Sequence, residues 1–304
     1  MTAREKNSIL VTGGRGFVGR ALVKLIQRSG YSVVSVDRVP IADAGGAGSE
    51  EAECDLFDTA RLRNIFERQR IREIVHLAAI LPTAAERNPL RATEVNVQGS
   101  LNLLELAREF EVRRFVFGSS LSVYGTYLAD RTVSEADRAA PEDLYGAAKL
   151  YVEQLGQAYH DCHGIEFASL RIGRVVGPGA KSVSSAWRSE IFELLKADYP
   201  AEISLPYRGS ENLLMLHVDD LAGMLLCLLH ASSVAHTVYN APCKSVVAGD
   251  LKRVVEDLNA NITVKLGDGA PAGNPRMLDS SRFQNEFQVE SVSIFDRIAE
   301  GRCE

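Results

Sequence analysis

Tyr145 and Lys149 are the residues whose types and spacing most directly suggest chemistry. They stand four positions apart in YGAAK, so on a helix both side chains lie on one face. A free phenol has a pKa of about 10 and is a weak base at neutral pH, but a nearby ammonium stabilises the phenolate and lowers that pKa. The pair would then take a proton from a substrate hydroxyl while hydride leaves the same carbon. The same spacing also occurs by chance on solvated helix surfaces.

Ser120 supports the chemical interpretation. It lies in FGSSLSVYG (117–125), directly after an apolar segment that predicts a strand over 114–118. Ligands of open α/β sheets bind at the carboxyl ends of strands, where Ser120 would hydrogen-bond the substrate oxygen and orient it for Tyr145. Serines at such positions also cap turns, and we expect that role for Ser119 and Ser122.

A glycine-rich turn near the N-terminus predicts a dinucleotide site. In TGGRGFVG (12–19), glycines at 13, 16 and 19 separate an apolar strand from an amphipathic helix. Such glycines allow a tight turn, a close approach of the backbone to a pyrophosphate, and close packing of the helix on the strand. The helix N-terminus offers unpaired N–H groups to the phosphates. An ordinary strand–helix turn is the alternative.

The residues that end the next strands refine the choice of dinucleotide. Asp37 follows the apolar run 33–36, where a carboxylate would accept both ribose hydroxyls and repel a 2′-phosphate, so NAD is favoured over NADP. Arg38 keeps the alternative open, because a guanidinium there could hold a 2′-phosphate. Asp55 and Leu56 close a further strand–helix unit and could contact the adenine, although an ordinary turn aspartate explains Asp55 equally well.

These residues require a parallel sheet that positions them. Nearly continuous apolar strands alternating with helical patterns indicate such a sheet with helices on both faces, a doubly wound α/β (Rossmann) fold. The expected strands are 8–12, 32–37, 73–77, 114–118 and 166–172, and the expected helices are 17–29, 59–69, 92–109 and 144–163.

The strand–helix alternation weakens after Arg171, and loop signals follow at Gly177-Pro178-Gly179 and at 267–275. We therefore expect a Rossmann domain over 1–172, to which 217–258 returns. A smaller substrate-binding lobe is expected to comprise 173–216 and 259–304.

Bulk properties restrict the function classes. A chain of 304 residues is long enough for one large domain or two, and its net charge of −6 argues against nucleic acid or a membrane surface as partner. Five cysteines without a CxxC spacing predict neither a disulfide framework nor a zinc site, and no other cluster has metal-ligand spacing. We expect a cytoplasmic protein without signal peptide, membrane span or metal.

The ordered series of motifs resembles the extended short-chain dehydrogenase/reductase family, also called NAD-dependent epimerase/dehydratase. Matches extend from residue 8 to about residue 287. They comprise TGGRGFVG (12–19), HLAA (76–79), NVQGS (96–100), SSLSVYG (119–125), YGAAK (145–149), LRIGRVVGP (170–178), HVDDLA (217–222) and LDSSRFQNEF (278–287).

The resemblance implies roles position by position. Ser120, Tyr145 and Lys149 would be catalytic, with NAD as cofactor and Lys149 also holding the nicotinamide ribose. The implied cofactor contacts are Gly13, Gly16, Phe17, Val18, Gly19, Asp37, Arg38, Asp55, Leu56, Leu77, Ala78, Ala79 and Asn96. It also implies a homodimer formed by helices 92–109 and 144–163, whose leucines at 101, 104, 150 and 155 could serve the sheet core instead.

Three departures bear on the substrate. Leu121-Ser122 replace the Asp-Glu pair of the family's dehydratases, which argues against water elimination. Arg174 stands where nucleotide-sugar epimerases have a phosphate-binding asparagine, and a guanidinium binds a diphosphate or a carboxylate equally well. Leu213 or a neighbour replaces an arginine of those enzymes. Arg208 could supply that charge from a nearby loop, or could be ordinary surface.

Three functional hypotheses follow. The first is an NAD-dependent enzyme that oxidises a secondary alcohol of a sugar or nucleotide sugar and, as an epimerase, returns the hydride to the other face. The second is a net dehydrogenase or reductase of a free sugar, sugar acid or related hydroxy compound. The third is a non-catalytic member that senses the dinucleotide, against which the complete set of Ser120, Tyr145 and Lys149 argues.

Overall fold

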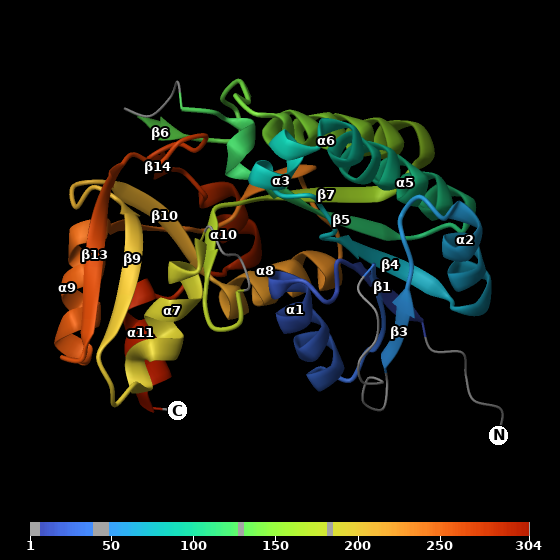
Figure 1. Cartoon of the computed structure of the whole chain (residues 1–304). Helices are drawn as coiled ribbons and strands as arrows, with labels where there is room; N and C mark the ends of the chain where they lie inside the picture. The colour runs from blue at the N-terminus through green and yellow to red at the C-terminus, as the bar shows by residue number, and fades with distance from the viewer. Residues whose placement is uncertain (1–6, 39–48, 127–130, 181–184, 304) are drawn as a thin grey trace.

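The computed structural model describes residues 7–38, 49–126, 131–180 and 185–303. At its centre lies a sheet of seven strands in the order β11-β7-β5-β4-β1-β2-β3 (Figure 1). All neighbouring strands in it are parallel. The strands are β1 (Ser8–Thr12), β2 (Ser32–Asp37), β3 (Ser49–Glu53), β4 (Ile71–His76), β5 (Arg114–Ser120), β7 (Glu166–Ile172) and β11 (Val238–Asn240). The predicted doubly wound α/β fold is confirmed.

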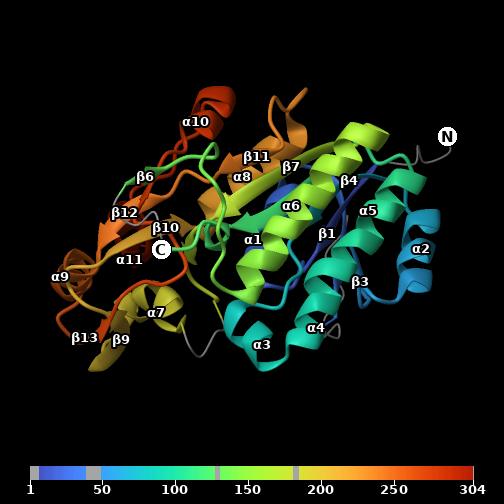
Figure 2. The same cartoon turned by 90° about the horizontal axis from the view of Figure 1, so that it is seen from above.

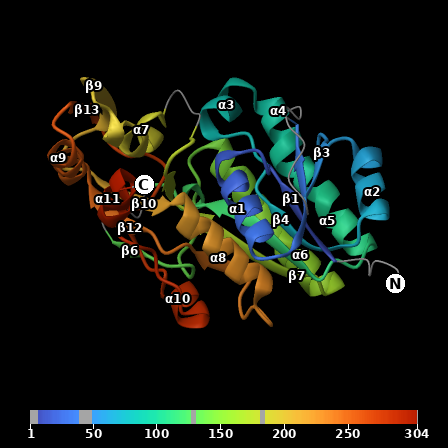
Figure 3. The same cartoon turned by 90° about the horizontal axis from the view of Figure 1, so that it is seen from below.

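Helices cover both faces of this sheet. Helices α2 (Thr59–Arg68), α5 (Gly99–Glu109) and α6 (Leu144–His163) lie on one face, and α1 (Phe17–Arg28) and α8 (Val218–His230) lie side by side on the other (Figures 1 and 3). Successive residues of a strand point to opposite faces, so both need to be apolar. Accordingly, Leu10 packs into the core under α2 and α5, while Ile9 and Val11 pack into the core under α1 and α8.

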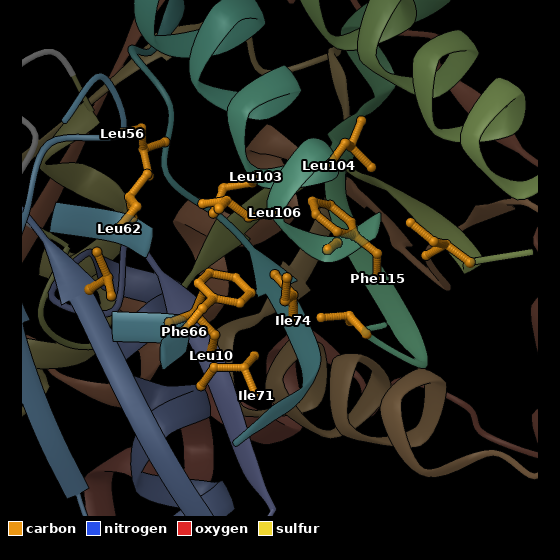
Figure 4. Packing of buried hydrophobic residues seen from close by; sticks show 14 of the residues in the cluster. Leu10, Leu56, Leu62, Phe66, Ile71, Ile74, Leu103, Leu104, Leu106 and Phe115 are labelled. Carbon is orange, nitrogen blue, oxygen red and sulfur yellow. The ribbon is translucent and has the colours of Figure 1, made fainter. Parts of the chain in front are cut away.

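Figure 4 shows the first of these cores. Leu62 and Phe66 of α2 and the leucines of α5 meet Ile74 and Phe115 of the sheet. Side chains of this kind stabilise the fold by about 1.5–3 kcal/mol each when they are fully buried. The core therefore holds the carboxyl ends of the central strands in fixed relative positions.

The predicted helix 92–109 is observed as three segments. An α-helical turn, α4 (Pro89–Thr93), leads into a π-helical turn over Glu94–Gln98 and then into α5. A short helix, α3 (Pro82–Arg87), precedes them. Single π-helical turns within helices are frequent at functional sites. This one carries Asn96, one of the predicted cofactor-side residues.

A smaller lobe lies beside the carboxyl ends of the large sheet (Figures 1 and 2). Its strands form a three-stranded sheet of order β12-β10-β8 and the pair β13-β9. The elements of the lobe are β8 (Arg174–Val176), α7 (Trp187–Glu193), β9 (Ala201–Tyr207), β10 (Asn212–His217), β12 (Lys244–Val247), α9 (Ala248–Leu258), β13 (Ile262–Gly269) and α11 (Ile294–Cys303). The remaining short elements are β6 (Thr132–Val133), β14 (Met277–Leu278) and α10 (Ser281–Phe287).

The structure divides the segment 217–258 between the two parts. Helix α8 and strand β11 pack with the large sheet, where Leu221 and Tyr239 belong to the core under α1. Strand β12 and helix α9 instead contribute Val246 and Leu251 to the core of the lobe. We therefore propose that the returning segment ends near Ala241 rather than at Leu258.

Within the described ranges, no helix has the length and apolar character needed to cross a bilayer. Those ranges also contain no group of three His, Cys, Asp or Glu side chains arranged to hold a metal ion. Cys54, Cys162, Cys227 and Cys243 are free thiols.

Candidate active site

The loops after β1 and β4 meet at the switch point of the sheet, where the chain turns to opposite sides. Leu77 N–H donates to the carbonyl of Thr12 at 3.1 Å. A Cβ added to Gly13 would lie 2.8 Å from the backbone nitrogen of Ala78. Leu77, Ala78 and Ala79 are only partly buried. Ligands of doubly wound sheets bind in the crevice at this position.

The glycine turn fits a pyrophosphate. Gly13 adopts φ +68°, a conformation that favours glycine, and a side chain on Gly19 would overlap the carbonyl oxygen of Gly13. Among the described residues beyond its chain neighbours and its own helix, a Cβ on Gly16 would meet only that oxygen within 4 Å, at 3.0 Å. Gly16 is the N-cap of α1, so the first amides of the helix, at Phe17 and Val18, adjoin this open space. The turn is thus closed on the protein side and open on the ligand side.

Asp37 lies at the end of β2, next to this turn. Its carboxylate accepts a hydrogen bond from Arg15 N–H at 3.1 Å. The guanidinium of Arg15 forms an ion pair with Glu51 of β3. The sequence analysis missed Glu51 because β3 (SEEAE) lacks an apolar pattern. Arg38 is exposed.

Asp55 is already engaged within its own turn. One carboxylate oxygen accepts from Phe57 N–H at 3.1 Å, and the other pairs with Arg91. Leu56 is 5% exposed and belongs to the core under α5. These contacts agree with the ordinary turn interpretation, and an adenine contact at Asp55 stays a prediction.

Asn96 and His76 connect the loops that border the crevice. Asn96 is buried and clamps Ile80, accepting from its N–H at 2.7 Å and donating to its carbonyl at 2.9 Å. His76 Nε2 lies 2.8 Å from Ser100 Oγ, and Nδ1 lies 2.6 Å from Thr12 Oγ1. Because Ser100 donates to the carbonyl of Asn96, His76 must donate through Nε2. Burial, with a smaller effect from the charge of Lys149, lowers the pKa of His76 to about 3. It is a neutral core histidine.

Ser120 combines the two roles that the sequence left open. It ends β5 and is 8% exposed. Its Oγ accepts from Ser122 N–H at 3.1 Å and thereby caps a short turn. The same hydroxyl donates to Ser122 Oγ at 3.1 Å and lies near enough to the phenol of Tyr145 to oppose a rise in its pKa. Ser119 instead donates to Glu153 of α6. The structure thus brings Ser120 to Tyr145.

Tyr145 and Lys149 lie on one face of α6, as their spacing predicts. Lys149 Nζ is 5.5 Å from the centre of the Tyr145 ring. It donates to the carbonyl of Gly118 at 2.7 Å and lies 4.5 Å from the ring of Phe117. Lys149 is 3% exposed. The carboxyl end of β5 therefore anchors the lysine beneath the phenol.

Burial dominates the titration of this pair. It raises the pKa of Tyr145 to about 12, a rise that the nearby Ser120 hydroxyl opposes. It also lowers the pKa of Lys149 to about 7, against the negative charge of Glu153. The lowered phenol pKa that the spacing suggested is therefore not found, because desolvation of the phenolate, together with the charge of Asp143, outweighs the opposing effect of Ser120.

Glu153 is a further residue that sequence reasoning missed. It follows Lys149 by four positions on α6, and that spacing could have identified it. Its carboxylate forms a bidentate pair with Arg171, at 2.7 and 3.0 Å, and both residues are buried. Arg171 of β7 thus holds in place the carboxylate of Glu153, whose negative charge acts on Lys149.

The predicted substrate residues Arg174 and Arg208 are not brought together. Arg174 is 7% exposed, and its Nε donates to Tyr207 Oη at 3.4 Å. The side chain of Arg208 is 52% exposed and pairs with Glu211. Adjacent residues of extended chain point to opposite sides, so Tyr207 faces Arg174 while Arg208 points elsewhere. Arg208 agrees with the surface interpretation, and a substrate contact there has no support from the geometry.

Comparisons with known proteins agree with this architecture. The sequence model of the NAD-dependent epimerase/dehydratase family matches residues 9–241. A UDP-glucose 4-epimerase of Erwinia amylovora is 30% identical over 265 residues, which are 77% of this chain and 77% of that protein. A uronate dehydrogenase of Pseudomonas putida is 32% identical over 175 residues, 57% of this chain and 63% of that enzyme. The solved structure of an L-threonine dehydrogenase from Cupriavidus necator has a similar fold, with a TM-score of 0.87, 21% identity, and coverage of 98% of this chain and 99% of that one.

Proposed function

Because the chain belongs to the NAD-dependent epimerase/dehydratase family, we propose that it oxidises a secondary alcohol of a sugar or nucleotide sugar, with NAD as hydride acceptor. The observation that carries this proposal is the position of Lys149, which is anchored at the carbonyl of Gly118 and lies 5.5 Å from the ring of Tyr145, with the Ser120 hydroxyl near the phenol. These groups lie at the carboxyl ends of the strands, as the glycine turn does. Such an arrangement suits removal of the proton from a substrate hydroxyl and of a hydride from the carbon that bears it.

Each residue of the trio has one task in this reaction. Ser120 holds the substrate oxygen by a hydrogen bond, and Tyr145 accepts the hydroxyl proton. Lys149, anchored at Gly118, supplies positive charge that stabilises the phenolate. NAD, when bound, provides the hydride acceptor and a further positive charge. The pKa of about 12 means that Tyr145 depends on those charges to act as a base near neutral pH.

The residues around the crevice would hold NAD. The amides of the glycine turn would bind the pyrophosphate, and Asp37 would bind the adenosine ribose. Leu77, Ala78 and Ala79 line the cofactor side of the crevice, and Asn96 acts by fixing the backbone at Ile80. Arg38, exposed beyond Asp37, leaves NADP as the alternative tested by cofactor competition.

A net dehydrogenase of a sugar acid or related hydroxy compound is the second candidate. Arg174 favours it, since this buried cation replaces the asparagine of nucleotide-sugar epimerases. The uronate dehydrogenase among the relatives is an enzyme of this class. Adding substrate with excess NAD separates the two: the dehydrogenase releases NADH in proportion to substrate, whereas the epimerase converts substrate without net NADH.

Tyr145→Phe tests the catalytic role. We expect turnover to fall by about 10²–10⁴-fold, while NAD affinity stays within about threefold of wild type. Tyr151→Phe is the matched control, because Tyr151 lies on the same helix and is 51% exposed. Wild-type turnover in Tyr145→Phe would refute the mechanism. Unchanged cellular function of this variant would favour a dinucleotide sensor.

We also propose that two copies associate through α5 and α6. Leu104 is fully buried in the core between the sheet and its helices. Leu101 and Leu155 are partly buried and pack against the same core, so these three leucines contribute to the core of one chain. Leu144 and Tyr151, seven positions apart on one face of α6, are 52% and 51% exposed. Light scattering of the purified chain tests this proposal, and Tyr151→Glu is expected to give a monomer.

A further inference from the structure

Arg174 and Arg188 form a pair of cations in the lobe that the proposed mechanism does not use. Arg174 begins β8, and Arg188 lies in the first turn of α7. Both approach Tyr207 at the end of β9. Arg174 Nε lies 3.4 Å from its phenol oxygen, and Arg188 lies over the ring of Trp187, at 5.8 Å, which in turn packs edge-on against Tyr207 with ring centres 6.1 Å apart. Three elements of the lobe thus converge on one point. No local pattern marks Arg188, because its position depends on how α7 packs.

Neither cation has an anionic partner in the described part of the chain. No carboxylate there lies within 4.0 Å of Arg174 or Arg188, whereas the buried Arg171 is paired with Glu153. Arg188 Nε is buried and makes no hydrogen bond. Burial, and then the charge of Arg174, lowers the pKa of Arg188. Two like charges held together without a counter-ion are unfavourable, so an anion that enters between them gains strongly.

The cation pair lies close to the catalytic serine. Ile172 of β7 is the neighbour of Ser120 in the large sheet, and Arg174 follows two residues later. Extended chain rises about 3.3 Å per residue, so the Cα atoms of Ile172 and Arg174 are within about 7 Å. A Cβ on the intervening Gly173 would lie 3.3 Å from the side chain of Leu121. One small substrate can therefore span the distance from Ser120 to the cations.

We propose that Arg174 and Arg188 bind a carboxylate of the substrate, so that the alcohol presented to Tyr145 belongs to a sugar acid or another hydroxy acid. This inference rests on the proposed function. A planar guanidinium binds a carboxylate by two parallel hydrogen bonds. The residues expected to bind a nucleotide diphosphate are less suitable. Leu213, which stands in place of an arginine of nucleotide-sugar epimerases, is fully buried in the lobe core, and Arg208 is paired with Glu211.

Matched probes test the proposal. D-galacturonate and D-glucuronate are each compared with the neutral parent sugar, D-gluconate with D-glucitol, and UDP-glucose serves as the phosphoryl probe. Binding is measured by thermal shift on the full-length Tyr145→Phe chain with NAD, so that it does not depend on turnover. At least one acid is expected to bind 10-fold or more tightly than its neutral partner. Binding of none of the acids, or binding of UDP-glucose alone, would overturn the proposal.

Variants of the cation pair supply the second test. Arg188→Met is expected to raise the KM or the dissociation constant of the acid at least 30-fold, Arg188→Lys less, with NAD affinity unchanged. Because the unpaired cation is removed, the unliganded Arg188→Met chain is also expected to melt no lower than wild type. Arg253→Met is the control, since Arg253 is exposed on α9. Acid binding unaffected by Arg188→Met would refute the inference.

The two proposals fail in different ways. An acid that binds through Arg188 but is not oxidised by the wild-type chain supports the carboxylate site and contradicts the proposed oxidation. Oxidation of a neutral sugar that is insensitive to Arg188→Met supports the oxidation and contradicts the carboxylate site.

Discussion

Gly16 allows the cofactor proposal to be tested separately from stability. Of the glycines at 13, 16 and 19, Gly13 and Gly19 face protein backbone, whereas a Cβ on Gly16 meets only the carbonyl oxygen of Gly13 among the described residues, at 3.0 Å. A methyl group there would project into the space that the pyrophosphate is proposed to occupy. Gly16→Ala is therefore expected to weaken NAD binding while the chain still folds.

The effect of Gly16→Ala on stability can be estimated from the backbone. Gly16 has φ −66° and ψ 172°, which alanine adopts without strain. Replacing an N-cap glycine by alanine costs about 1 kcal/mol, and the reduced freedom of the unfolded chain returns about 0.4–1 kcal/mol. The free energy of unfolding should stay within about 1 kcal/mol of wild type. We expect NAD affinity to fall at least tenfold, or about 1.4 kcal/mol.

The assay combines urea unfolding with titration of NAD by calorimetry. Gly223→Ala is the control, because Gly223 lies inside α8 with nothing within 4 Å of an added Cβ. That variant should gain about 0.5–1 kcal/mol of stability and bind NAD normally. Gly19→Ala should lose both stability and NAD binding, because its side chain would overlap backbone. Wild-type NAD affinity in Gly16→Ala would refute the placement of the pyrophosphate.

Three further predictions concern the titrating groups and the buried ion pair. With NAD saturating, kcat/KM should rise with pH up to about 7, because the fraction of ionised Tyr145 rises while Lys149 stays charged. Above pH 7 it should level off, because Lys149 loses its proton as more Tyr145 ionises. In Lys149→Arg, kcat/KM should keep rising to pH 10, since only Tyr145, with a pKa of about 12, can then titrate. If kcat/KM of Lys149→Arg levelled off at the same pH as that of wild type, Lys149 would not be the group that ends the rise. The pKa of His76 is about 3 when folded and 6.5 when unfolded, so the unfolded chain binds more protons below pH 6.5. The free energy of unfolding should therefore fall by up to about 5 kcal/mol between pH 6.5 and 3, and this pH dependence should be weaker in urea titrations of His76→Gln. Glu153→Gln leaves Arg171 buried without its partner and should cost about 3–5 kcal/mol in chemical denaturation, less when combined with Arg171→Met; equal losses in the single and double variants would argue against the pairing.

Much of the large sheet could be predicted because its signals are local. The apolar runs 8–12, 32–37 and 166–172 match β1, β2 and β7 at both ends, and the helical pattern 144–163 matches α6. Strand β3 was missed because edge pairing with β2, rather than an apolar pattern, orders its sequence SEEAE. The acidic pair Asp219-Asp220 has residue types that suit a helix cap, but it does not cap α8. His217 accepts from Asp219 N–H, and Asp220 pairs with Arg297 of α11, a contact between distant segments.

The sequence by itself determined the glycine turn, the position of Asp37 after its strand, and the shared helix face of Tyr145 and Lys149. These features depend on the backbone geometry of a few consecutive residues, which the residue types largely fix. Only the tertiary structure decided that Arg188 joins Arg174, that Arg208 turns to Glu211, and that burial sets the pKa values of Tyr145 and Lys149. Burial and the convergence of distant elements depend on how the whole chain packs, and no local spacing encodes them.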